Sequence, residues 1–89
     1  MPSFSDAVAS FRERGARLVT ITSVRNGEEA RLTYYFDLDG ELEMLDAETV
    51  DGHMTSLFSL FPGADVVERE IYQVFGVKFL GNPHLGVKS

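Results

Sequence analysis

Three consecutive charged residues, Glu68, Arg69 and Glu70, bring two carboxylates and a guanidinium close together in the sequence. Two carboxylates can act as general acid and general base when both face the same site. The surrounding pattern predicts a helix, and side chains two positions apart on a helix diverge by about 200°. The two glutamates therefore cannot share a site. We predict instead that Glu68 caps the start of the helix, while Arg69 and Glu70 suit either a solvated surface or contact with a neighbouring chain.

Metal binding would depend on His53, His84 and carboxylates, because the sequence contains no cysteine. The histidines do not have the close spacing of paired ligands on one helix, and we favour surface positions for both. Without cysteine the chain forms no disulfide and binds no iron–sulfur cluster through thiolates. We therefore expect no metal site.

Nucleotide binding and nucleophilic catalysis lack their usual motifs. Gly40, Gly52 and Gly63 stand singly in turn contexts rather than in a phosphate-binding run, and no serine lies in a G-x-S-x-G elbow. Catalysis by this chain alone thus has no visible site.

The charge is unevenly distributed. The net charge is −6, and residues 32–56 carry seven acidic residues and no lysine or arginine. Such a chain repels phosphates, so we expect no binding to nucleic acid or to an anionic membrane surface. No apolar run approaches the roughly 20 residues of a membrane span, which predicts a soluble protein without direct membrane insertion. We interpret the acidic run as a solvated face; the alternative is a contact for a basic partner.

The N-terminal residues predict a helix over roughly residues 4–14. Ser3 is its expected N-cap, with Asp6 in the capping-box position, and Gly15 is a typical stop. The apolar stripe consists of Phe4, Ala7, Val8 and Phe11.

Two strands, Arg17–Arg25 and Glu28–Asp37, are predicted on either side of Asn26-Gly27. This dipeptide favours a type I′ turn. The resulting register would place Ile21 opposite Leu32 and Val19 opposite Tyr34, so that apolar residues meet on one face.

A third strand, Glu41–Glu48, follows Asp39-Gly40. A two-residue turn here would place Phe36 opposite Glu43. We therefore predict an odd-length loop or a bulge that pairs Phe36 with Met44, and Leu38 with Leu42.

The main helix is predicted after a short helical turn at Ser56–Phe61 and the Pro62-Gly63 break. We expect Asp65 to be its N-cap with Glu68 in the capping box, and Gly76 to end it. Its core-facing stripe would consist of Val67, Ile71, Val74 and Phe75. A short strand at Lys78–Leu80 and a C-terminal tail would follow.

This order predicts an α+β fold in which residues 1–89 form a single domain. A three-stranded or slightly larger antiparallel meander would be packed by the N-terminal and C-terminal helices. The second sheet face would carry Thr20, Thr22, Thr33 and Tyr35, and would be left polar or covered by a partner.

Residues 61–85, FPGADVVEREIYQVFGVKFLGNPHL, resemble the signature of the NuoC-type (30 kDa) subunit family of respiratory complex I and of energy-converting membrane-bound nickel–iron hydrogenases. We call these residues the signature segment. The pattern has prolines, glycines, charged residues and aromatics at fixed spacing. The positions that we expect to carry the signature and partner docking are Pro62, Gly63, Glu68, Arg69, Glu70, Tyr72, Phe75, Gly76, Phe79, Gly81 and Pro83.

Several positions depart from the family pattern. Val66-Val67 stand where an aromatic is usual, Gln73 replaces an acid, Asn82 a histidine and His84 an aspartate. Gly86 replaces a basic residue, and the sequence ends at Ser89 where family members continue into a tail. These departures favour the shorter relatives in the hydrogenases and related dehydrogenases.

The resemblance implies a cofactor-free, non-catalytic peripheral subunit of an NADH dehydrogenase or hydrogenase complex in the electron-transport chain. It would dock on the large catalytic subunit, on the cytoplasmic side of the membrane, and stabilise it. Two alternatives stay open: a small stand-alone acid–base enzyme using Glu68, Glu70, Tyr72 or His84, and a free adaptor that forms a homodimer.

Overall fold

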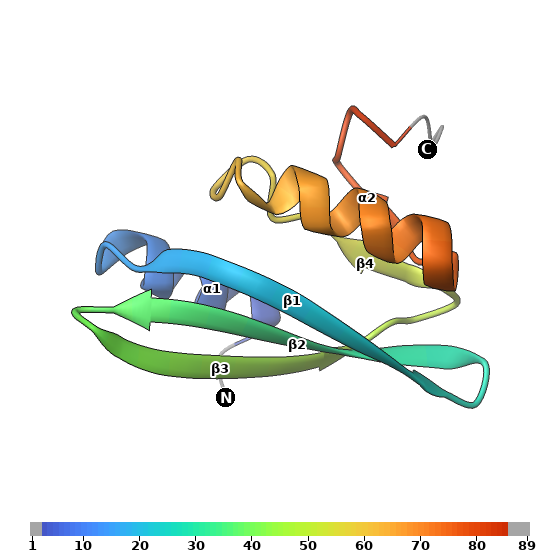
Figure 1. Ribbon diagram of the computed structural model, residues 1–89, viewed down its shortest axis with the longest axis horizontal. Coiled ribbons are helices and arrows are strands. Elements are labelled where there is room, and N and C mark those ends of the chain that lie inside the picture. Colours follow the sequence, from blue (N-terminus) through green and yellow to red (C-terminus); the bar gives the residue numbers. More distant parts are fainter. Residues whose placement is uncertain (1–2, 86–89) are drawn as a thin grey trace.

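The structure is a computed structural model that describes residues 3–85. Its elements follow in the order α1 (Phe4–Glu13), β1 (Arg17–Asn26), β2 (Glu29–Leu38), β3 (Glu41–Glu48), β4 (His53–Thr55), α2 (Ala64–Phe75) and β5 (Lys78–Leu80). Strands β1, β2 and β3 form an antiparallel sheet in that order, and β4 and β5 form a separate parallel pair. Figure 1 shows α1 lying across the sheet and α2 running beside β1. The predicted α+β fold is confirmed.

The core lies between the sheet and the helices. The ring of Phe36 on β2 stacks on Phe11 of α1 at 4.3 Å between centroids, and Phe61 lies 5.3 Å from the same ring. Tyr34, two positions earlier on the same face of β2, packs against Phe4 at 5.2 Å. Because these contacts come from one sheet face, both the N-terminal helix and the segment leading into α2 cover that face. We call it the inner face.

The caps of the helices follow the local sequence. Ser3 and Asp6 form the predicted capping box at the start of α1, and Gly15 adopts a positive φ of 81° just after α1 ends. Gly76 ends α2 in the left-handed conformation, with its N–H bonded to the carbonyl of Tyr72. Val77 is buried directly after this cap, as expected.

The β1–β2 hairpin does not turn at Asn26-Gly27. Asn26 pairs with Glu29, so the two loop residues are Gly27 and Glu28, and Ile21 faces Tyr34 rather than Leu32. Only the first loop residue, Gly27, has a positive φ (64°), which is the pattern of a type II′ turn. This turn lets Asn26 stay in the strand. The predicted register was therefore wrong by two residues, a shift that keeps each side chain on its expected face.

Val19 does not face Tyr34 either. Leu18 pairs with Phe36 and Thr20 with Tyr35, so a bulge at Val19 adds one residue to β1. Val19 is 53% exposed as a result.

The β2–β3 connection is the tight turn that the hydrophobic pattern argued against. Asp39 and Gly40 both have positive φ (52° and 84°), as in a type I′ turn, and Phe36 pairs with Glu43. The predicted odd-length loop was therefore wrong. The local turn chemistry prevails because β3 is an edge strand, whose inward positions are only partly covered.

The parallel β4–β5 pair is joined through α2, and it places residues 78–80 beside residues 53–55. Strand β5 was predicted; β4 was not, because three residues carry no periodicity. The segment after β4 forms the predicted single helical turn, which is closed by the Phe61 N–H on the Leu57 carbonyl at 2.7 Å. The predicted C-terminal tail lies mostly outside the described residues.

Within residues 3–85, no helix has the length and apolar character needed to cross a membrane.

Candidate docking site around a buried glutamate

The carboxylate of Glu68 lies at the centre of the signature segment and is completely buried. The prediction that it belongs to a capping box was wrong. Helix α2 starts two residues earlier than predicted, with Gly63 as its N-cap, and no side chain caps it. Asp65 therefore lies inside the first turn, and Glu68 points from the second turn toward the core side of the helix. For Glu68 to take part in a capping box, the N-cap would have to be Asp65, three positions before it. The observed N-cap, Gly63, lies further back and has no side chain.

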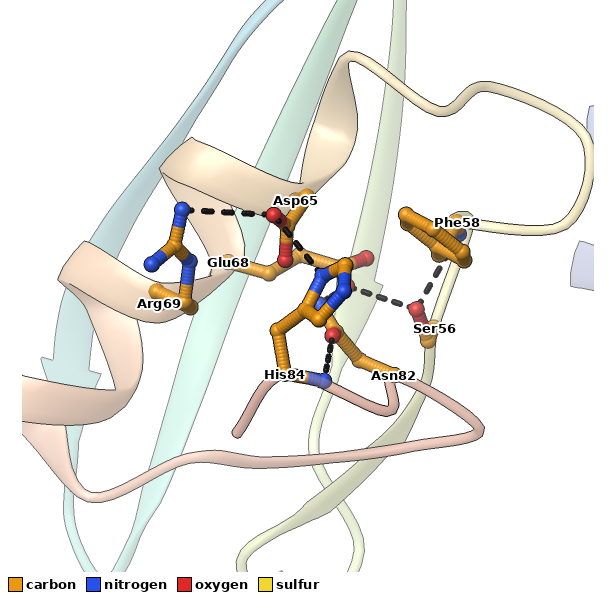
Figure 2. A network of polar contacts seen from close by, with 7 residues as sticks. All are labelled: Ser56, Phe58, Asp65, Glu68, Arg69, Asn82 and His84. Carbon is orange, nitrogen blue, oxygen red and sulfur yellow. Dashed lines mark hydrogen bonds and ion pairs between the residues drawn. The ribbon is translucent and has the colours of Figure 1, made fainter. Parts of the chain in front are cut away.

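Three donors from two distant segments bind this carboxylate. Its Oε1 accepts from the hydroxyl of Ser56 at 2.6 Å and from the side-chain amide of Asn82 at 2.9 Å. Its Oε2 accepts from the backbone N–H of Leu57 at 2.8 Å. Figure 2 shows Glu68 between the Ser56 and Asn82 segments. Charge-assisted bonds of this kind are among the stronger ones in proteins, so Glu68 joins α2 to the segments on both sides of it.

Asp65 extends the network to the surface. Its Oδ2 lies 3.2 Å from the Arg69 guanidinium and 3.1 Å from Nδ1 of His84, whose ring meets Phe58 edge-on (Figure 2). Partial desolvation raises the pKa of Asp65. The Asn82 amide, the His84 ring and the Arg69 charge outweigh that effect, so its pKa is lowered overall.

Asn82 also fixes the chain that follows it. Its Oδ1 accepts from the backbone N–H of His84 at 2.9 Å while its amide donates to Glu68. Asn82 thus connects the buried carboxylate to the last described residues. The two departures from the family pattern at Asn82 and His84 occupy the positions that contact Glu68 and Asp65.

A second carboxylate holds the start of β2 to the link before β4. Glu29 accepts from the Thr49 hydroxyl at 2.6 Å and from the N–H groups of Gly52 and Asp51 at 3.0 and 3.1 Å. These bonds, that of Thr49 first, lower the pKa of Glu29. The Thr49 hydroxyl in turn accepts from the Ala30 N–H at 2.9 Å. This second network places residues 49–52, and so the strand β4 that leads to Ser56.

The predicted signature residues divide into a buried framework and an exposed surface. Glu68 and Phe79 are buried, and Tyr72 and Phe75 are half-buried. The exposed members are Pro62, Gly63, Arg69, Glu70, Gly76, Gly81 and Pro83. In the predicted apolar stripe, Ile71 is buried but Val74 is 74% exposed, so the inward face of α2 passes instead through Ala64, Glu68 and Ile71. Helix α2 is rotated about its own axis relative to the prediction, because the charged side chain of Glu68 is part of its buried face.

The geometry of this site is that of a carboxylate that holds chain segments together. Both oxygens of Glu68 are hydrogen-bonded and shielded from solvent, so a substrate cannot reach the carboxylate, whereas Glu70 is exposed on the helix surface. No group of three or more metal-ligating side chains occurs among residues 3–85. What the arrangement does is hold the exposed side chains of the segment in one fixed shape.

Ser56 and Asn82 were not predicted to belong to this site. No sequence pattern marked them, because β4 was not predicted and the burial of Met54 and Phe79 beside them is seen only in the structure. Recognising their role needs the parallel β4–β5 pairing, which places them at the same end of two strands 25 residues apart.

A known protein family and several curated proteins are similar to this chain. The family described as "Respiratory-chain NADH dehydrogenase, 30 Kd subunit" matches residues 3–87. The chain is 41% identical over 56 residues to NAD(P)H-quinone oxidoreductase subunit J of Prochlorococcus marinus (strain NATL1A), which covers 63% of this chain and 27% of that protein. It is 50% identical over 36 residues to the NAD(P)H-quinone oxidoreductase subunit J of Synechococcus sp. (strain RCC307), covering 38% of this chain and 20% of that protein. The chain thus spans well under half of these relatives.

A solved structure shares the fold. The trypsin-resistant fragment (1-134) of Nqo5 superposes with a TM-score of 0.72 and 21% identity, covering 90% of this chain and 74% of that fragment. At this identity the likeness shows the fold alone. The match to the family over residues 3–87, which include every described residue, is the stronger finding: this chain belongs to the respiratory-chain NADH dehydrogenase 30 kDa subunit family.

Proposed function

We propose that this chain is a non-catalytic peripheral subunit that docks on the large catalytic subunit of its complex and stabilises it. The complex would be a complex I-like NADH dehydrogenase or an energy-converting membrane-bound hydrogenase. The subunit would sit on the cytoplasmic side of the membrane without inserting into it, and residues 1–89 would fold as one domain.

The observation that carries the proposal is the combination of the family match with the Glu68 network. The match covers residues 3–87. The network uses the most buried charge of the signature segment for internal bonds, and leaves Arg69 and Glu70 exposed beside it. A signature motif whose central acid is structural and whose neighbouring charges are exposed fits docking better than catalysis.

A prearranged surface also suits a permanent subunit. Binding costs side-chain and loop ordering, and a segment already fixed by hydrogen bonds loses less free energy to that ordering. We expect the docked interface to bury more than about 1,000 Å², as specific interfaces do.

Affinity purification from the native organism tests the proposal. A tagged chain should recover the large subunit of one redox complex, and the identity of that subunit distinguishes NADH dehydrogenase from hydrogenase. Recovery of the chain alone, or only as a homodimer, would contradict the proposal.

A charge reversal on the exposed part of the segment sharpens this test. Glu70→Arg should lower recovery of the large subunit, because Glu70 would face the partner. Glu13→Arg, an equal reversal at an exposed position near the end of α1, should leave recovery unchanged. Equal recovery with both variants would place the docking surface elsewhere.

A further inference from the structure

The outer face of the β1–β2–β3 sheet carries an apolar patch that the fold itself does not use. The patch consists of Val19, Tyr35, Leu42 and Met44. Val19, Leu42 and Met44 are 53%, 59% and 64% exposed, and Tyr35 is half-buried among them. Large apolar side chains gathered in this way mark interaction surfaces more often than isolated ones do.

The register explains why these residues meet. Met44 pairs with Tyr35, which pairs with Thr20, so the three side chains form one row on the face opposite Phe36. Leu42 lies in the neighbouring row, opposite Asp37. The bulge adds Val19 to β1 between the inward-facing Leu18 and Ile21. It places Val19 beside the row that contains Tyr35 and Met44.

The tight turn at Asp39-Gly40 creates the patch. A register shifted by one residue would have buried Leu42 and Met44 and exposed the glutamates. The observed register does the opposite: it directs both apolar residues outward and turns Glu43 toward the partly covered inner face. Leu42 and Met44 are therefore left out of the core and are exposed on the outer face.

The surroundings of the patch are acidic. Asp39 lies in the turn before β3 and Asp46 follows Met44 on the outer face, and residues 32–56 contain no lysine or arginine. On the β1 side, Arg17 lies in the row of Leu42 and is paired with Asp37 at 3.0 Å. Acidic residues on an edge strand also discourage aggregation, which explains the charges but not the outward-facing Leu42 and Met44.

We propose that this patch binds a second protein subunit of the complex, through an apolar surface of that subunit framed by lysine or arginine. The inference rests on the proposed function, and it adds a surface separate from the signature segment. A second copy of this chain is a poor occupant, because each copy carries a net charge of −6 and both patches would have the same acidic surroundings.

Methionine oxidation offers a direct test, since the chain contains a matched pair. Met44 is 64% exposed and Met54 is 9% exposed. Oxidation by dilute peroxide, measured by mass spectrometry, should be faster at Met44 than at Met54 in the free chain. In the purified complex the rate at Met44 should fall about fivefold or more, because oxidation follows exposure, while Met54 changes little.

A photo-crosslinking residue placed at Leu42 then identifies the covering chain. A crosslink to a lysine- or arginine-rich surface of another subunit supports the inference, and a crosslink to a second copy of this chain overturns it. An assembled complex in which Met44 oxidises as fast as in the free chain overturns this inference alone. A chain that joins no complex overturns the proposed function, and this inference with it.

Discussion

At the scale of single residues, burial of a carboxylate is favourable only when its oxygens are hydrogen-bonded, because desolvation of the charge is costly. Glu68 meets this condition through Ser56, Leu57 and Asn82. These partners come from segments before and after α2, so the residue bonds α2 to two segments that the β4–β5 pairing brings side by side. This role, rather than acid–base chemistry, accounts for a charge inside the signature.

Removing this carboxylate should destabilise the fold strongly. Glu68→Ala leaves the Ser56 hydroxyl, the Leu57 N–H and the Asn82 amide buried without an acceptor, which should cost about 3 kcal/mol in the free energy of unfolding. Glu70→Ala, at an exposed position on the same helix, should change it by less than about 0.5 kcal/mol. Urea unfolding measures both. Similar values for the two variants would show that the network contributes little.

The Glu29 network predicts that the stability of the fold depends on pH in the acidic range. The pKa of Glu29 is lowered in the folded state from its ordinary 4.5, mainly by the Thr49 hydroxyl. A lowered pKa stabilises the fold above the ordinary value, and this contribution is lost as the pH falls through the folded value. The melting temperature should therefore drop below about pH 4.5, and less steeply in Glu29→Gln. Parallel curves for the two proteins would contradict this assignment.

At the scale of elements, the features set by neighbouring residues could be predicted from the sequence. The capping box of α1, the stop at Gly76 and the three strands all depend on short-range chemistry. The register of β3 could not be predicted, since a turn preference at Asp39-Gly40 opposed the hydrophobic pattern of the strand. The partners of Glu68 could not be predicted either, because Ser56 and Asn82 meet it only once β4 and β5 pair.

The register of β3 can be checked by substitution. Met44→Thr should change the free energy of unfolding by less than about 0.5 kcal/mol, because the side chain is exposed on the outer face. Leu45→Ala, on the adjacent inward position, should cost about 1.5 kcal/mol, less than a fully buried leucine. If the larger loss appears at Met44, the strand is shifted by one residue.

The end of α2 gives a second test at this scale. Gly76 has φ of 74° with open space around its missing Cβ, so Gly76→Val should cost about 1 kcal/mol or more from backbone strain alone. Gly63→Ala, at a glycine with helical φ and equally open surroundings, should change stability by less than about 0.5 kcal/mol. An unchanged melting temperature in Gly76→Val would show that α2 does not need this conformation to end.

At the scale of the whole molecule, one set of residues forms the interior and another set forms two exposed surfaces. The inner sheet face, both helices and the Glu68 network form the interior. The exposed side chains of the signature segment and the apolar patch on the opposite sheet face are the surfaces that we propose for partners. Two such surfaces on different sides of one small fold would let the chain contact two neighbouring subunits at once.

Co-elution in the native organism tests the central claim most directly. Membranes would be solubilised in mild detergent and fractionated by size, and the tagged chain and its neighbours quantified in each fraction by mass spectrometry. The proposed role predicts that the chain elutes with a redox complex at one copy per large catalytic subunit. Elution near its own mass of 9.9 kDa, with no large subunit in the same fractions, would contradict it.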